Sequence, residues 1–143
     1  MKTFNILTHP VLLIVSFLFI LISGEHMGGF YLMYLLIALP HGSSHALLGL
    51  IGVLLLVISY TRYKRAYSPF IGPVLNILGV CCLVLSLAIF FYKDKQGYND
   101  GTFEQLVPQI TLTIFGLLSL LFIISNVVRP SKKEPVQGNL SFK

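Results

Sequence analysis

The chain has 143 residues, of which 55% are hydrophobic and only 10% are Asp, Glu, Lys or Arg, and its mean hydropathy is +0.84. Soluble globular chains carry roughly 25% charged residues, and a short chain has too much surface to hide this much apolar area from water. The composition therefore excludes a water-soluble globular domain. The net charge of +5 lies in short segments that set membrane orientation, so we expect no nucleic-acid partner.

Uncharged stretches at residues 3–24, 26–61, 66–92 and 105–128 separate the charged residues of the chain. Since a helix needs about 20 mostly apolar residues to cross a bilayer, these stretches predict an all-α integral membrane protein. In chain order we place spanning helices at about residues 8–23, 44–60, 70–92 and 106–128, which makes a bundle of about four. We expect the first to be retained, because no signal-peptide cleavage pattern follows it.

Residues 30–39 form an apolar segment that is too short to span, because a helix of that length rises only about 15 Å. We predict a re-entrant or interfacial half-helix there, which returns the chain to the side from which it came. The alternative is a helix extended by residues 26–29 into a marginal span. On this interpretation residues 1–128 form one transmembrane domain, and residues 129–143 form a disordered cytoplasmic tail.

Basic residues follow the second and the fourth predicted spans. Arg62, Lys64 and Arg65 predict that the loop at residues 61–69 is cytoplasmic, together with the C-terminus, while the more acidic loop at 93–105 lies outside. The same three side chains are candidates for binding anionic lipid headgroups. With no eukaryotic sorting signal in the chain, we expect a bacterial inner membrane.

Small and polar residues recur on one face of each later helix. In lipid, where burying apolar side chains gains little, such faces let helices pack closely. The candidate packing residues are Gly49, Gly52, Gly72, Asn76, Gly79 and Gly116. We predict that these faces pack within the chain or in an oligomer, and that Asn76 forms an interhelical hydrogen bond. A solute path lined by the same faces is the alternative.

Glu25, His26, His41 and His45 lie around the predicted half-helix. If that segment is re-entrant, its two ends meet at one face of the membrane, and the spacing of His41 and His45 would place two imidazoles on one helical face. With Glu25 or His26 as a third ligand, such a pair can hold a transition metal. The competing hypothesis is that these residues cap helix ends at the headgroup boundary. We predict no cofactor and keep the metal as the alternative.

The sequence contains no nucleophile elbow, phosphate-binding loop or catalytic triad pattern, so we expect no enzymatic activity. The favoured hypothesis is a non-catalytic subunit or scaffold in the lipid bilayer, which packs through its small-residue faces against a second copy or another membrane protein. One alternative is a membrane enzyme or cofactor-binding subunit that uses the His/Glu cluster. The other is an oligomeric channel or small-solute carrier.

Overall fold

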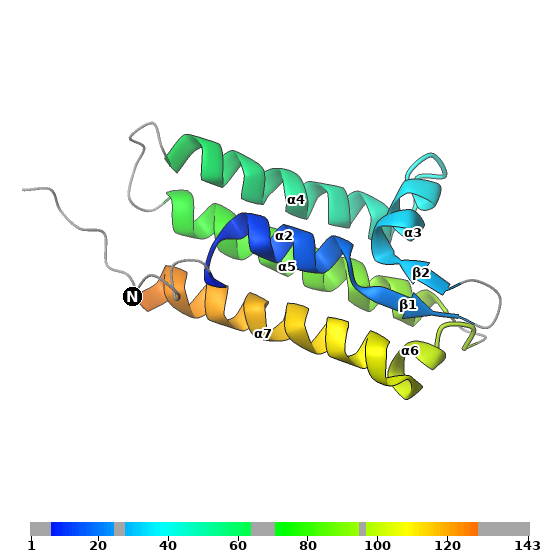
Figure 1. The fold of residues 1–143 in the computed structure, drawn as a ribbon. Helices are drawn as coiled ribbons and strands as arrows, with labels where there is room; N and C mark the ends of the chain where they lie inside the picture. Colours follow the sequence, from blue (N-terminus) through cyan, green and yellow to red (C-terminus); the bar gives the residue numbers. More distant parts are fainter. Residues whose placement is uncertain (1–6, 25–27, 64–70, 95–96, 129–143) are drawn as a thin grey trace, which may run out of the picture.

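Three long helices run side by side through the structure, a computed structural model that describes residues 7–24, 28–63, 71–94 and 97–128 (Figure 1). They are α4 (Ser44–Tyr63), α5 (Ile71–Lys93) and α7 (Leu106–Val128). Within the described ranges these three are long and apolar enough to cross a membrane. The predicted all-α membrane bundle is therefore confirmed, and the three later helices lie close to their predicted bounds.

The long helices expose most of their apolar surface. Only 22% to 33% of each candidate spanning window is buried inside the protein. Large side chains on the outer faces, such as Leu54, Leu85 and Leu117, are about half exposed. An apolar surface of this extent is not stable in water, whereas hydrocarbon chains of a bilayer solvate it at no cost. The outer surface therefore identifies a membrane protein.

The first apolar segment differs from its prediction. It contains α2 (Pro10–Leu18), a helix of only nine residues, and then continues as β1 (Leu21–Ser23). Nine helical residues rise about 14 Å, which is half the hydrocarbon thickness, so the prediction of a continuous spanning helix over residues 8–23 is wrong. Strand β1 pairs antiparallel with β2 (Gly28–Phe30), and Leu21 lies opposite Phe30.

Threonine side chains of the C-terminal half allow this segment to leave the helix. The amide of Leu21 donates to Thr111 Oγ1 at 3.1 Å, and the amide of Ser23 donates to Thr102 Oγ1 at 3.0 Å. Non-helical backbone at membrane depth is tolerated only where the protein satisfies its polar groups. Thr102 lies in the short helix α6 (Gly101–Glu104) and is fully buried.

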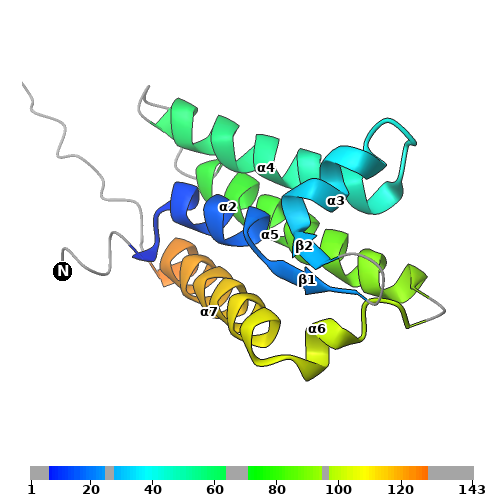
Figure 2. The same cartoon turned by 45° about the vertical axis from the view of Figure 1, so that its right-hand side comes forward.

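Helix α3 (Tyr31–Ala38) occupies the predicted half-helix and is eight residues long. It begins after β2 and leads through the turn at residues 39–43 into α4, so both of its ends lie at the same end of the bundle (Figures 1 and 2). Gly42 has φ +64, a conformation that glycine adopts without strain, and it lets the chain turn into α4. This arrangement is the one expected of a re-entrant or interfacial helix.

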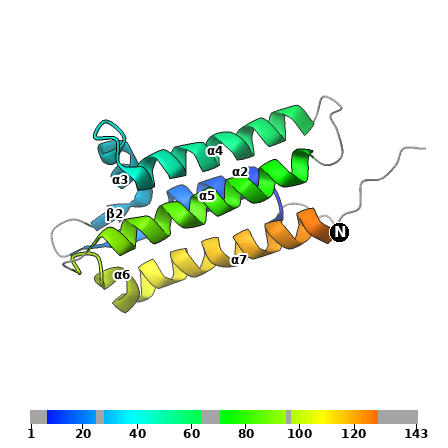
Figure 3. The same ribbon diagram turned by 180° about the vertical axis from the view of Figure 1, so that it is seen from behind.

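The two ends of the bundle can be followed by contacts between distant segments (Figure 3). At one end, the ring of His9 lies 5.0 Å from that of Tyr60, so the start of α2 is beside the end of α4. At the other end, Lys93 Nζ donates to Ser44 Oγ at 2.7 Å. The short helix α2 fills the space between α4 and α7, where the buried ring of Phe17 contacts that of Phe115.

Candidate functional site

Helices α4 and α5 meet most closely at two glycines. A Cβ atom built on Gly52 would lie 2.9 Å from the carbonyl oxygen of Gly79 and 2.7 Å from Leu83 Cδ2, and one built on Gly79 would lie 3.2 Å from the carbonyl oxygen of Gly52. Real Cβ atoms do not approach backbone this closely, so only glycine fits at Gly52 without movement. This contact is the centre of the α4–α5 hairpin.

A hydrogen-bonded network joins α3, α4 and α5 near the next glycine on α4. Ser86 Oγ donates to the carbonyl oxygen of His45 at 2.7 Å, and it lies 2.9 Å from the Tyr31 hydroxyl, which therefore donates to Ser86. A Cβ atom on Gly49 would lie 3.0 Å from Ser86 Oγ and 3.0 Å from Leu35 Cδ2. Gly49 thus leaves the space in which this buried network forms.

The other predicted packing residues on α5 take part in polar contacts between helices. Asn76 Nδ2 donates to Asn126 Oδ1 of α7 at 2.7 Å, and the carbonyl of Gly72 accepts from Ser59 Oγ of α4 at 3.3 Å. Both contacts lie at the end of the bundle that holds the last turns of α4 and α7. Asn76 is therefore engaged inside the chain.

Gly116 on α7 has a different environment. No heavy atom of the described residues lies within 4 Å of the Cβ position that a side chain would occupy there. Thr113, one turn earlier, is exposed and bonds to the carbonyl of Gln109 in its own helix. Ser119, three residues after Gly116, is buried in the bundle. Gly116 makes no packing contact within the described chain.

The predicted metal ligands are only partly described. Glu25 and His26 lie outside the described residues. His41 is exposed in the turn before α4, and its Nδ1 lies 2.9 Å from the Ile37 carbonyl oxygen. Because α4 begins at Ser44, the two histidines do not share a helical face, and that part of the prediction is wrong. Among the described residues no three His, Cys, Asp or Glu side chains are close enough to hold a metal.

The side chains of the predicted headgroup-binding residues lie outside the described part of the structure. Arg62 belongs to the last turn of α4, but its side chain lies outside the described part of the structure, as do Lys64 and Arg65. Their role stays a prediction.

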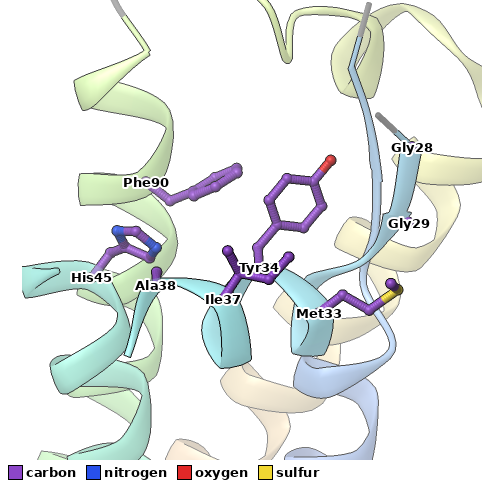
Figure 4. Close-up of a pocket in the computed structure, with 8 residues that line it drawn as sticks. All are labelled: Gly28, Gly29, Met33, Tyr34, Ile37, Ala38, His45 and Phe90. Atoms are coloured by element: carbon purple, nitrogen blue, oxygen red, sulfur yellow. The ribbon is translucent and has the colours of Figure 1, made fainter. Parts of the chain in front are cut away.

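A cavity of about 230 Å³ lies where β2, α3, the first turn of α4 and the last turn of α5 come together. Its lining is almost entirely apolar or aromatic. The lining residues are Gly28, Gly29, Met33, Tyr34, Ile37, Ala38, His45 and Phe90 (Figure 4). The sequence predicted a functional role for His45, as a candidate metal ligand, but it gave no signal for Phe90 or Met33. These are ordinary apolar residues that the fold brings to the cavity.

His45 is the titratable group most deeply enclosed at this cavity, with 9% of its surface exposed. Its ring lies edge to face against Phe90, with ring centroids 5.4 Å apart, and Nε2 is buried without a hydrogen-bond partner among the described residues. Lys93 lies nearby but outside the lining, where it bonds to Ser44. The site thus offers one imidazole in an apolar, aromatic chamber.

No protein-family model, no curated protein and no solved structure matches this chain.

Proposed function

We propose that the chain is a multi-pass subunit of a membrane complex, without catalytic chemistry of its own, and that it binds another transmembrane helix along α7. The partner helix belongs to a second copy of this chain or to a different membrane protein. In either case the contact is centred on Gly116 and Thr113, which face away from the bundle. The environment of Gly116 is the observation that carries this proposal.

The argument rests on what glycine costs in a helix. Inside a helix, glycine is less favourable than alanine by about 1 kcal/mol. At Gly52 and Gly79 the close packing of α4 against α5, which leaves no room for a methyl group, offsets that cost. At Gly116 the described residues leave open space, so none of them requires glycine there. A helix packed closely against α7 would require it, since small residues at such positions let two backbones approach.

The proposed orientation follows from the charges at the two ends of the bundle. The start of α2, the end of α4, the start of α5 and the end of α7 lie at one end (Figures 1 and 3). Segments rich in Lys and Arg follow α4 and α7 in the sequence, so this end is the cytoplasmic one by the positive-inside rule. We place the protein in a bacterial inner membrane, with the loop between α5 and α7 outside.

A substitution pair on the outer surface tests the association. Gly116→Leu places a bulky side chain on the proposed interface, and Cys81→Leu makes a small-to-large change on the exposed face of α5. Two differently tagged copies are expressed together, extracted in mild detergent and captured through one tag, and the captured proteins are identified by mass spectrometry. We expect Gly116→Leu to lose the second copy or the partner protein, and Cys81→Leu to retain it.

The monomer itself should tolerate Gly116→Leu, because leucine is the better helix former and the space is open. Loss of association with unchanged helical content therefore supports the proposal. A wild-type protein that is captured alone, with neither a second copy nor a stoichiometric partner, contradicts it. Equal loss in both variants contradicts it as well, because the interface would not then lie on α7.

A further inference from the structure

The cavity beside His45 has a composition that suits a ligand with one polar atom. Its walls are formed by side-chain carbon from Met33, Ile37 and Ala38 and by the rings of Tyr34 and Phe90. Figure 4 shows the His45 ring projecting from α4 beside Phe90, with Tyr34 across the space. Among the described residues, only the Tyr34 hydroxyl otherwise brings a side-chain polar atom to the lining.

The imidazole is the second observation that indicates a ligand. A buried polar atom without a hydrogen-bond partner costs about 1–3 kcal/mol, and such groups are rare in folded proteins. Nε2 of His45 has no partner among the described residues, and the residue exposes only 9% of its surface. Nε2 is enclosed, so binding through it would require the ring to rotate about its terminal torsion, which is soft in histidine.

We propose that this cavity binds a small, flat, uncharged molecule dissolved in the membrane, whose ring carries a carbonyl or hydroxyl oxygen that hydrogen-bonds to His45. This is the chemistry of a quinone or a phenol. A neutral imidazole donates through one nitrogen and accepts through the other, so it can serve either oxygen. This site is separate from the α7 surface, so the proposal does not depend on the proposed association.

The aromatic walls favour a flat ring. Phe90 lies edge to face against Tyr34, with centroids 5.3 Å apart, and against His45 at 5.4 Å. Aromatic groups attract a further ring in the same edge-to-face or offset geometry, and a methionine sulfur such as that of Met33 also favours aromatic contacts. A volume of about 230 Å³ accommodates one substituted ring and is too small for a two-chain lipid.

The described lining residues carry no formal charge, which disfavours an ionic ligand. Burying a carboxylate or an ammonium group in an apolar cavity is very costly unless an opposite charge is buried with it. Lys93 is exposed and donates to Ser44, outside the lining. His45 follows the first residue of α4 and Phe90 is in the last turn of α5, so the cavity lies where the spanning helices end. The proposed ligand, which partitions into the bilayer, would enter the cavity at this level.

A pair of probes with the same carbon skeleton tests the proposal. Duroquinone, a fully substituted benzoquinone, carries two carbonyl oxygens, and durene is the corresponding hydrocarbon without them. The full substitution of duroquinone also prevents addition to the thiols of Cys81 and Cys82. Binding is measured by equilibrium partition into nanodiscs that contain the protein, with empty nanodiscs as the reference. We expect saturable binding of one duroquinone per chain, tighter than durene by about 2- to 10-fold, the contribution of one hydrogen bond.

Three variants locate the site. His45→Phe keeps an aromatic ring and keeps the backbone carbonyl that accepts from Ser86, so the fold is retained while the preference for duroquinone disappears. Ala38→Phe fills the cavity and should remove the binding of both probes. His41→Phe is the matched control, because His41 is exposed in the turn and does not line the cavity. It should bind both probes as the wild type does.

Three results would overturn the proposal. The first is wild-type uptake of duroquinone that does not exceed that of empty nanodiscs. The second is equal affinity for duroquinone and durene, which would identify a plain apolar cavity of the kind that a lipid tail fills. The third is a preference for duroquinone that survives His45→Phe in a variant whose helical content by circular dichroism matches the wild type.

Discussion

The same substitution at two glycines should have opposite effects on stability. Gly52→Ala adds a methyl group at the closest contact of α4 and α5, 2.7 Å from Leu83 Cδ2 and 2.9 Å from the carbonyl oxygen of Gly79. Gly116→Ala adds the same group where no described heavy atom lies within 4 Å. Both positions are inside long helices, so the change in helix propensity is about the same in each.

The magnitude follows from two opposing terms. Replacing glycine by alanine inside a helix gains about 1 kcal/mol. Forcing an extra methyl group into a packed contact costs about 1–3 kcal/mol, and here one of the close atoms is backbone, which cannot turn aside as a side chain can. We therefore expect Gly116→Ala to raise the free energy of unfolding by up to about 1 kcal/mol. Gly52→Ala should be less stable than Gly116→Ala by about 1–3 kcal/mol, because only the packing cost differs.

The assay is reversible unfolding in mixed micelles, in which the fraction of sodium dodecyl sulfate is raised and helicity is followed by circular dichroism. The measurement is made at a micelle excess that keeps chains apart, so that association through α7 does not contribute. If the two variants unfold with free energies equal to within about 0.5 kcal/mol, the α4–α5 contact is not the tight one that the structure indicates.

Three further predictions address the buried polar groups. Ser86→Ala removes the bonds to the His45 carbonyl and to Tyr31, and it should lower the free energy of unfolding by about 1–3 kcal/mol. The control is Ser119→Ala, because the buried Ser119 hydroxyl has no partner among the described residues. This variant should be neutral or stabilising in the same assay. Thr102→Val leaves the amide of Ser23 without its acceptor, so hydrogen exchange measured by mass spectrometry should become faster in β1 and stay unchanged in α5. Burial raises the pKa of Tyr31 to about 12, with a smaller opposing effect of the Ser86 hydrogen bond, so absorbance at 295 nm should show a late-ionising tyrosine that Tyr31→Phe removes. The stability contributed by the neutral phenol should be fully present below pH 10, the usual tyrosine pKa, and should be lost as the pH rises through about 12.

The three long helices could be predicted from the sequence because the thickness of the bilayer sets the length of apolar chain that a spanning helix needs. A sufficiently long uncharged run is nearly enough to specify a helix that can cross the membrane. The bounds of α5 and α7 follow almost entirely from such runs. The first segment is equally apolar, but whether it stays helical depends on groups far along the chain. The hydroxyls of Thr111 and Thr102, which accept the amides of β1, are 90 and 79 residues away. No local pattern reports that such acceptors will be in place.

The candidate sites were predictable to different degrees. Helical spacing alone put Gly52 and Gly79 on packing faces, but the same spacing put Gly116 on one too, and no described residue packs against Gly116. The metal hypothesis required one helix through His41 and His45, although Gly42 lies between them and its positive φ ends any such helix. Phe90 carries no signal of its own, since its place in the cavity depends on how α5 meets α3 and α4.

Ser86 connects the stable part of the bundle to the cavity. Its hydroxyl donates to the carbonyl of His45 and accepts from Tyr31, so one side chain on α5 fixes the first turn of α4 and the first residue of α3 together. These two elements carry His45 and Tyr34, which both line the cavity. Ser86 bonds to the backbone of residue 45, and the imidazole packs against Phe90 while its Nε2 has no hydrogen-bond partner among the described residues. A ligand that hydrogen-bonds to this nitrogen would leave the bond between Ser86 and the His45 carbonyl in place.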